Sequence, residues 1–192
     1  MTSSKQNWKR LNSIPSALDR LLSLDARLSR QLYLPPESSW WNLVRLVAHL
    51  GDGSLVFGGL GLVYILGWLG SKPQLCQASL LIVLIVWAVM GVVTLVKFRV
   101  RRQRPRPPGE FVTFQYDAYS FPSGHAARLT AVAASVMFFD PLLGLVLGAL
   151  ALSVAAARVL IGIHYLGDIV IGLGLGLLIA WEGVTLFSSL LP

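Results

Sequence analysis

Charged side chains and cysteines are scarce in this sequence, and each scarcity excludes a class of protein. Only 13% of the 192 residues are charged and 55% are hydrophobic, with a mean hydropathy of +0.67. A soluble domain of this length needs a more polar surface, so the composition predicts an integral membrane protein. The single cysteine, Cys76, excludes an internal disulfide and a metal site made of several cysteines.

Acidic residues are scarce as well, because nine Asp and Glu stand against sixteen Lys and Arg, and the formal net charge is +7. An excess of positive charge is compatible with nucleic acid, anionic lipid or a substrate that carries phosphate. The basic residues are unevenly distributed, and their positions relative to the apolar runs decide between these partners.

Five apolar runs approach the length that crosses about 30 Å of hydrocarbon. They cover about residues 54–69, 75–96, 126–139, 142–160 and 169–191. Upstream, IPSALDRLLSLDARLSRQLYL has leucines at helical spacing and predicts an amphipathic helix on the membrane surface. The stretch SSWWNLVRLVAHLG is either a second amphipathic helix on the membrane surface or a half-buried helix packed on the bundle. We therefore predict an all-α integral membrane protein with five to six transmembrane helices, divided into an amphipathic segment (1–37) and a membrane-embedded domain (38–192).

Successive membrane crossings alternate in direction, so the polar ends of the runs are predicted to meet at one end of the bundle. The residues at this end are Lys97, residues 123–125, Arg158, Asp168, His49 and Asp52. The opposite end has little more than the short loop around Lys72. This asymmetry predicts one polar site, whatever the exact helix boundaries.

The first polar stretch is KFRVRRQRP. Lys97 and Arg104 are seven residues apart, which places both on the same side of a helix that leaves the membrane, and Pro105 ends that helix. The stretch is either a basic flank that orients a span or a clamp for an anion such as phosphate.

The second polar stretch is FPSGHAAR. A proline at the first helical position leaves the N–H groups of Ser123, Gly124 and His125 free at a helix start, where the backbone favours anions. Gly124 permits close approach, and Ser123 is equally a plausible N-cap. An imidazole beside a bound phosphate is well placed to donate a proton to a leaving oxygen.

The third polar stretch is ARVLIGIHYLGD. Arg158 at the end of an apolar run needs an anionic partner. His164 and Asp168 are four residues apart, so on a helix the carboxylate can accept from one ring nitrogen and leave the other exposed as a nucleophile. Alternatively, Asp168 caps the last span and His164 is an interfacial residue.

Taken together, the three stretches resemble the signature of the type 2 phosphatidic acid phosphatases, which are integral-membrane lipid phosphatases related to vanadium haloperoxidases. The shared pattern is lysine, six residues, Arg-Pro; then Pro-Ser-Gly-His; then arginine, five residues, histidine, three residues, aspartate, from Lys97 to Asp168. One position departs from the family, because Ala157 replaces the serine that usually precedes the arginine of the third motif.

The resemblance implies a role for each matching residue. His164 attacks phosphorus and forms a phosphohistidine, Asp168 holds its ring, and His125 protonates the leaving oxygen and then activates water. The phosphate ligands that it implies are Lys97, Arg104, Ser123, Gly124 and Arg158. It implies no metal and no cofactor, and the partners are a lipid phosphate and the membrane lipids rather than nucleic acid.

The stretch FVTFQYDAYSFPSGHA, with VRRQRP and LDARLSR, is similar to the subgroup that acts on polyisoprenoid diphosphates and phosphates. The alternatives are a lipid phosphotransferase, a phosphatidic acid or undecaprenyl diphosphate phosphatase and, with intact catalytic residues against it, a non-enzymatic lipid-binding member. Arg128 is expected to have a structural role, pairing with Asp117 or Asp52, or to bind a second phosphate. His49 and Asp52 are expected to form a capped turn rather than to act in catalysis.

The basic residues also predict the side of the membrane on which the site lies. Those near the span ends at the polar end, apart from the phosphate ligands, are Arg45, Arg99, Arg101, Arg102 and Arg106. Only Lys72 lies at the opposite end. Because positive residues favour the cytoplasm, a cytoplasmic site is predicted.

Overall fold

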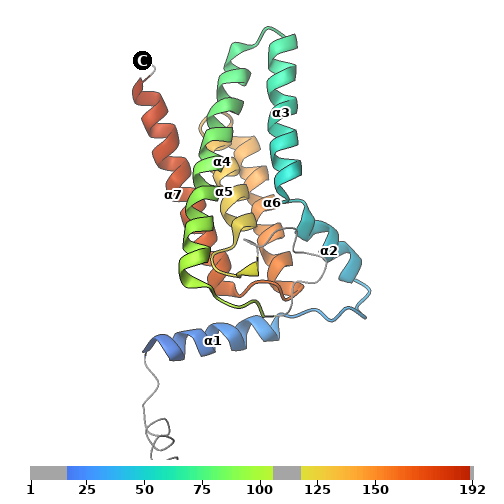
Figure 1. The fold of residues 1–192 in the computed structure, drawn as a ribbon. Helices are drawn as coiled ribbons and strands as arrows, with labels where there is room; N and C mark the ends of the chain where they lie inside the picture. The colour runs from blue at the N-terminus through green and yellow to red at the C-terminus, as the bar shows by residue number, and fades with distance from the viewer. Residues whose placement is uncertain (1–16, 106–117, 191–192) are drawn as a thin grey trace, which may run out of the picture.

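The computed structural model describes residues 17–105 and 118–190, and the regular secondary structure in these residues is helical. The helices are α1 (Ala17–Gln31), α2 (Trp41–His49), α3 (Gly53–Leu69), α4 (Pro73–Val100), α5 (Gly124–Met137), α6 (Pro141–Leu160) and α7 (Leu166–Leu190). Helices α3 to α7 form a bundle, and α1 lies across one of its ends (Figure 1). The all-helical fold predicted for the chain is confirmed in the described residues.

Three helices are long and apolar enough to cross a membrane, namely α4, α6 and α7. A fourth span exists if α2 and α3, which are bent by 54° at the break between them, are taken together. Helix α5 has 14 residues, about 21 Å at 1.5 Å per residue, and is too short to cross alone. The predicted number of five to six transmembrane helices therefore remains a prediction.

The helix ends follow from local sequence. Ser123 and Asp140 are the N-caps of α5 and α6, because their side chains accept hydrogen bonds from the amides of Ala126 (3.4 Å) and Leu143 (3.0 Å). Pro141 occupies the first turn of α6, where no amide hydrogen is needed. Helix α4 ends at Val100 because the next residue, Arg101, is left-handed with φ of 52°.

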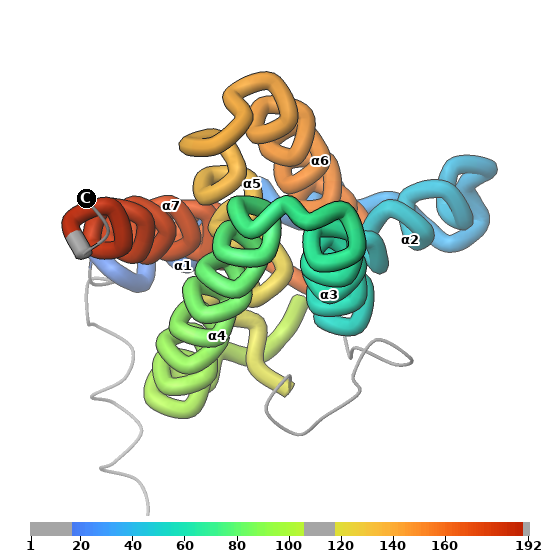
Figure 2. The backbone as a smooth tube through the Cα atoms, turned by 90° about the horizontal axis from the view of Figure 1, so that it is seen from above, coloured from blue at the N-terminus to red at the C-terminus, as the bar shows by residue number. Residues whose placement is uncertain are grey.

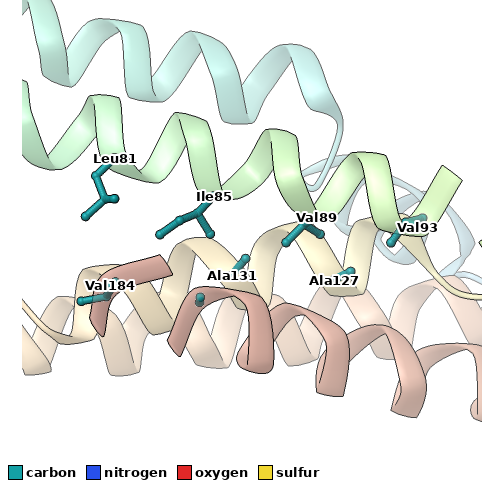
Figure 3. Packing of buried hydrophobic residues seen from close by; sticks show 8 residues of the cluster. Leu81, Ile85, Val89, Val93, Ala127, Ala131 and Val184 are labelled. Atoms are coloured by element: carbon teal, nitrogen blue, oxygen red, sulfur yellow. The ribbon is translucent and has the colours of Figure 1, made fainter. Parts of the chain in front are cut away.

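Helix α5 is the centre of the bundle, with α4, α6 and α7 around it (Figure 2). Aliphatic side chains of α4 and α7 pack on small residues of α5 in one core cluster: Leu81, Ile85, Val89, Val93, Ala127, Ala131, Ala180 and Val184 (Figure 3). Gly172 lets α7 approach closely, because a β-carbon there would lie 2.6 Å from the carbonyl oxygen of Ser123. This contact fixes the start of α7 against the start of α5.

The outer surface of the bundle is apolar. Leu84, Trp87, Leu145, Leu152 and Leu177 are each more than half exposed. Such a surface requires lipid around it, so the chain is an integral membrane protein.

The structure settles the two interpretations of α2. Trp41, Val44 and Val47 pack against a core cluster that includes Ala48 of α2 and Ile161 at the end of α6. Helix α2 is therefore half-buried on α6, and its bend into α3 brings residues 50–53 to the polar end of the bundle.

Candidate active site

The polar ends of the helices meet where α1 crosses the bundle (Figure 1). Most of the predicted site residues are almost fully buried there: Lys97, Arg104, Ser123, Arg158, His164 and Asp168 are each at most 8% exposed. Burying this many ionisable groups is unfavourable unless each has hydrogen-bond or charge partners. The end of the bundle is thus a polar site inside an otherwise apolar protein.

Two of the predicted phosphate ligands now donate to backbone carbonyls. Lys97 Nζ donates to the carbonyl oxygen of Tyr119 at 2.7 Å, and Arg104 Nη1 donates to that of Ile163 at 3.1 Å. The prediction that both residues share one helix is wrong, because α4 ends at Val100 and Arg104 lies in the following non-helical segment. That segment turns back and places Arg104 beside the residue that precedes His164.

The start of α5 differs from the prediction in two details. Pro122 precedes the N-cap Ser123 instead of occupying the first helical position. The amide of Ser123 is not free, because it donates to the carbonyl oxygen of Asp168 at 3.0 Å. The N-cap interpretation of Ser123 is confirmed, because its hydroxyl accepts from the amide of Ala126. The bond from the Ser123 amide to Asp168 ties the start of α5 directly to α7.

His125 contacts a carboxylate and a guanidinium through the same nitrogen. Its Nε2 lies 2.7 Å from Asp52 Oδ1 and 3.3 Å from Arg158 Nη1. Because a guanidinium only donates and a carboxylate only accepts, the shorter contact requires Nε2 to carry a hydrogen. The contact with Arg158 is then a close approach of two donors, which a bound anion between them would relieve.

Asp52 lies in the turn between α2 and α3, outside both helices. Its carboxylate caps no amide of α3 and instead contacts two imidazoles, His125 at 2.7 Å and His49 Nδ1 at 3.0 Å. The hydrogen bond with His125 is the main cause that lowers the pKa of Asp52 to about 2, although partial burial opposes it. The expected turn is present and Asp52 is the N-cap residue of α3, but its side chain makes no cap and is instead an ionised neighbour of His125.

His164 and Asp168 meet at the start of α7. His164 lies in the turn that precedes the helix, not on the helix as predicted, and Asp168 lies in its first turn. His164 Nδ1 lies 3.5 Å from Asp168 Oδ2, within ion-pair distance, and that oxygen accepts the amide hydrogen of Tyr165 at 2.8 Å. Catalytic hydrogen bonds often shorten only when substrate is bound.

Arg158 connects the two histidines. Its guanidinium lies beside His125, and its carbonyl oxygen accepts from the amide of His164 at 3.3 Å. The two histidines therefore belong to one end of the bundle, as the alternation of spans predicts.

A family model described as the PAP2 superfamily matches residues 78–190, more than half of the chain. The chain belongs to the PAP2 superfamily. The matched segment contains the three polar stretches, so the resemblance found in the sequence is confirmed.

Curated relatives match a smaller part of the chain. Two proteins named decaprenylphosphoryl-5-phosphoribose phosphatase, from Mycobacterium tuberculosis strains CDC 1551 / Oshkosh and ATCC 25618 / H37Rv, are 36% identical over 100 residues. The match covers 47% of this chain and 55% of each relative, so the chain spans about half the length of the curated relatives it matches.

Two solved structures share the fold. The PAP2 type phosphatidylglycerolphosphate phosphatase of Bacillus subtilis matches with a TM-score of 0.73 and 22% identity, over 90% of this chain and 88% of that one. LpxE of Aquifex aeolicus matches with a TM-score of 0.59 and 20% identity, over 84% and 95% of the two chains. At these identities the similarity concerns the fold alone.

The PAP2 signature does not include two polar residues that contact the third motif. Arg102, interpreted from the sequence as a basic flank, donates from Nη1 to Asp168 Oδ1 at 2.7 Å and from Nη2 to Asp25 Oδ2 at 2.7 Å. Asp25 lies on α1, in the stretch LDARLSR. Neither spacing nor charge alone indicates this contact, because the partners are 66 and 77 residues apart.

Arg128 contacts two groups that the sequence did not predict as its partners. Its guanidinium donates to the carbonyl oxygen of Gly51 and to the sulfur of Met90, and so supports the turn that carries Asp52. Asp117, one of its expected partners, lies outside the described residues. Among the described residues no group of three or more His, Cys, Asp or Glu is arranged to hold a metal.

Proposed function

We propose that this PAP2 protein is a metal-independent phosphatase that hydrolyses a phosphate ester of a membrane lipid. One observation carries the proposal: at one end of the bundle, two histidines on separate elements each lie next to a carboxylate, and Arg158 connects them. Two imidazoles at a site with buried cations suit a nucleophile and a general acid.

In the proposed first step, Nε2 of His164 attacks phosphorus while its Nδ1 faces Asp168. The bond between phosphorus and the lipid oxygen breaks, its electron pair stays on that oxygen, and His125 gives it a proton. The lipid alcohol leaves, or the lipid monophosphate if the substrate is a diphosphate. A phosphohistidine remains.

In the second step, His125, now neutral, takes a proton from water, whose oxygen attacks the phosphohistidine. The bond from phosphorus to nitrogen breaks, and its electron pair returns to His164. Inorganic phosphate leaves, so one water is consumed for each ester cleaved.

The phosphate is proposed to bind to Lys97, Arg104 and Arg158, with the hydroxyl of Ser123 and the amide of Gly124 at the start of α5. The two cations that now donate to carbonyls would gain a charged acceptor, and charge-assisted hydrogen bonds are about twice as strong as neutral ones. Their positive charge would stabilise the charge that develops on phosphorus in the transition state.

Ala157, where the family has a serine, contributes no such hydrogen bond. It is 3% exposed and packs with Ala48 and Ile161 in the apolar contact of α2 with α6. The phosphate therefore depends on the remaining ligands.

The proposed substrate is a polyisoprenoid diphosphate or phosphate. The name of the mycobacterial relatives specifies a decaprenyl-linked phosphoribose, which supports a polyprenyl lipid phosphate as the substrate class. A phosphotransferase would form the same phosphohistidine and differ only in its acceptor, and a phosphatidic acid or undecaprenyl diphosphate phosphatase would differ only in the lipid.

A phosphate-release assay tests the proposal. Purified protein in nanodiscs is given farnesyl diphosphate, phosphatidic acid or undecaprenyl diphosphate, and we expect the fastest release from an isoprenoid substrate, unchanged by EDTA. His164→Ala should lower kcat about 10³-fold or more, because the nucleophile is lost. Thr185→Ala, at the other end of α7, is the matched control. Phosphate release that survives His164→Ala would refute the mechanism.

The site is proposed to face the cytoplasm, with residues 1–37 as an amphipathic segment before the membrane-embedded phosphatase domain. Arg102 no longer counts as a flanking charge because it is paired, and Arg106 lies outside the described residues. In a Cys76→Ala background, an impermeant thiol reagent added to intact cells should label Lys72→Cys and not Glu37→Cys. The reverse pattern would place the site outside.

A further inference from the structure

Helix α1 is attached to the start of α7. Asp25 Oδ1 accepts the amide hydrogen of Gly167 at 2.9 Å, and the hydroxyl of Ser29, one turn later, accepts that of Leu166 at 2.9 Å. These are amides of the first turn of α7, which have no partner within the helix. Helix α1 thus supplies the acceptors that the start of α7 needs.

The fit between the two helices is close. A β-carbon on Gly167 would lie 2.9 Å from Asp25 Oδ2, so a side chain there would displace the carboxylate from its position against the backbone. Leucines flank Asp25 on the same face of α1, seven and four residues before it and three after it, and they are exposed: Leu18, Leu21 and Leu28 at 63%, 63% and 42%. This amphipathic pattern suits a helix at the membrane surface that is held to the bundle by polar contacts.

Arg102 is the centre of these contacts. One arm of its guanidinium binds Asp168 and the other binds Asp25, both at 2.7 Å, and Cζ of the group lies over the Tyr165 ring, 3.9 Å from its centre. An arginine held by two carboxylates and an aromatic face has little freedom to turn. It therefore fixes the position of the oxygen of Asp168 that it binds.

We propose that Asp25 and Arg102 are positioning residues for Asp168, so that α1 sets the orientation of His164 through the chain Asp25, Arg102, Asp168. The proposal rests on the function proposed above, in which Asp168 orients the nucleophile. Asp168 has no exposed surface and divides its oxygens between Arg102 and the contacts with Tyr165 and His164. Without Asp25, Asp168 is the one carboxylate that still binds Arg102, and Arg102 can then draw Asp168 away from the imidazole of His164.

The test compares charge-neutral, nearly isosteric variants in the full-length protein in nanodiscs, with farnesyl diphosphate as substrate. A displacement of about 1 Å at a catalytic group costs about 100-fold in rate, so a partial loosening should lower kcat about tenfold. We expect this fall for Asp25→Asn and for Arg102→Gln, with KM changed less than about twofold, because neither residue contacts the phosphate. Asp19→Asn, the same change of charge on the same helix, should keep the kcat of the wild type.

A double-mutant cycle separates positioning from general loss of stability. Because Asp25 acts through Arg102, Asp25→Asn should have almost no further effect on kcat in the Arg102→Gln background. The midpoint of thermal unfolding is measured for every variant. If Asp25→Asn does not fold, Asp25→Glu and Arg102→Lys are used, and Asp25→Glu should retain more activity than Arg102→Lys, which loses the two-armed geometry.

The outcomes distinguish the two proposals. The positioning chain is overturned if Asp25→Asn has the kcat of the wild type, or if its effect is undiminished in the Arg102→Gln background. In either case, loss of activity in His164→Ala would still support the proposed phosphatase function. Activity that survives His164→Ala defeats the proposed function itself, whatever Asp25→Asn does.

Discussion

The surroundings of the two histidines have the same components and different rigidity. Each ring has a carboxylate beside it, Asp168 for His164 and Asp52 for His125. Asp168 is fully buried and bound by Arg102 and by the amide of Tyr165, whereas the side chain of Asp52 is 40% exposed and is carried by the break between α2 and α3.

This difference matches the roles proposed for the rings. A nucleophile must approach phosphorus along one direction, which favours a fixed carboxylate behind it. An acid that later acts as a base must exchange its proton, which favours a partner that reaches water. The two histidine–carboxylate pairs are similar in composition, and their different rigidity and solvent access suit them to the two different proposed roles.

Removal of His125 should give the largest contrast between leaving groups. General acid catalysis contributes about 10²–10⁴-fold, so His125→Ala should lower kcat for farnesyl phosphate by that factor. The loss in the first step should be far smaller for p-nitrophenyl phosphate, because p-nitrophenolate leaves without a proton.

Rapid mixing of this variant with p-nitrophenyl phosphate should show a burst of p-nitrophenol followed by slow turnover, because the phosphohistidine accumulates. His164→Ala serves as the control and should show no burst. An equal loss for both esters would remove His125 from the role of general acid.

Neutralising Asp52 should have a smaller effect that depends on pH. Asp52 is ionised above about pH 2, and the other charged groups near His125 are Arg158 and Arg128, both cationic. Asp52→Asn removes the only nearby negative charge known among the described residues, so the protonated ring becomes less stable. A charge-assisted hydrogen bond is worth about 1.5–3 kcal/mol, so kcat should fall about tenfold or more.

The pH profile provides the check on Asp52. In the Asp52→Asn variant, the alkaline limb of the kcat profile should move to lower pH, because His125 loses its proton more readily. A uniform loss with an unmoved profile would show that Asp52 only supports the fold.

The smallest effect is expected at His49. Its contact with Asp52 joins two side chains that are 38% and 40% exposed, and solvent-exposed ion pairs contribute little. His49→Gln should therefore change kcat by less than about threefold in the same assay. A loss as large as that of Asp52→Asn would mean that His49 belongs to the proton path.

The sequence predicted the meeting of the polar ends, because that result follows from the alternation of crossings. The N-cap at Ser123 was also predictable from local chemistry. Two details were not predictable. Helix α4 stops because Arg101 has a left-handed backbone conformation, which residues other than glycine rarely adopt. The second detail is that Asp25 binds Arg102 across 77 residues of sequence. That contact depends on where α1 lies across the bundle, which no local pattern specifies.

The shortness of α5 has a consequence for the surrounding bilayer. Its far end leads into a turn, and the apolar side chains there and at the start of α6, Phe138, Phe139 and Leu142, are 47%, 51% and 73% exposed. About 21 Å of helix falls roughly 9 Å short of the hydrocarbon thickness, but residues 124–136 are buried or half-buried behind α4, α6 and α7, which are long enough to cross. The bilayer therefore meets these longer helices, and the helix that holds His125 is shielded from lipid along almost its whole length.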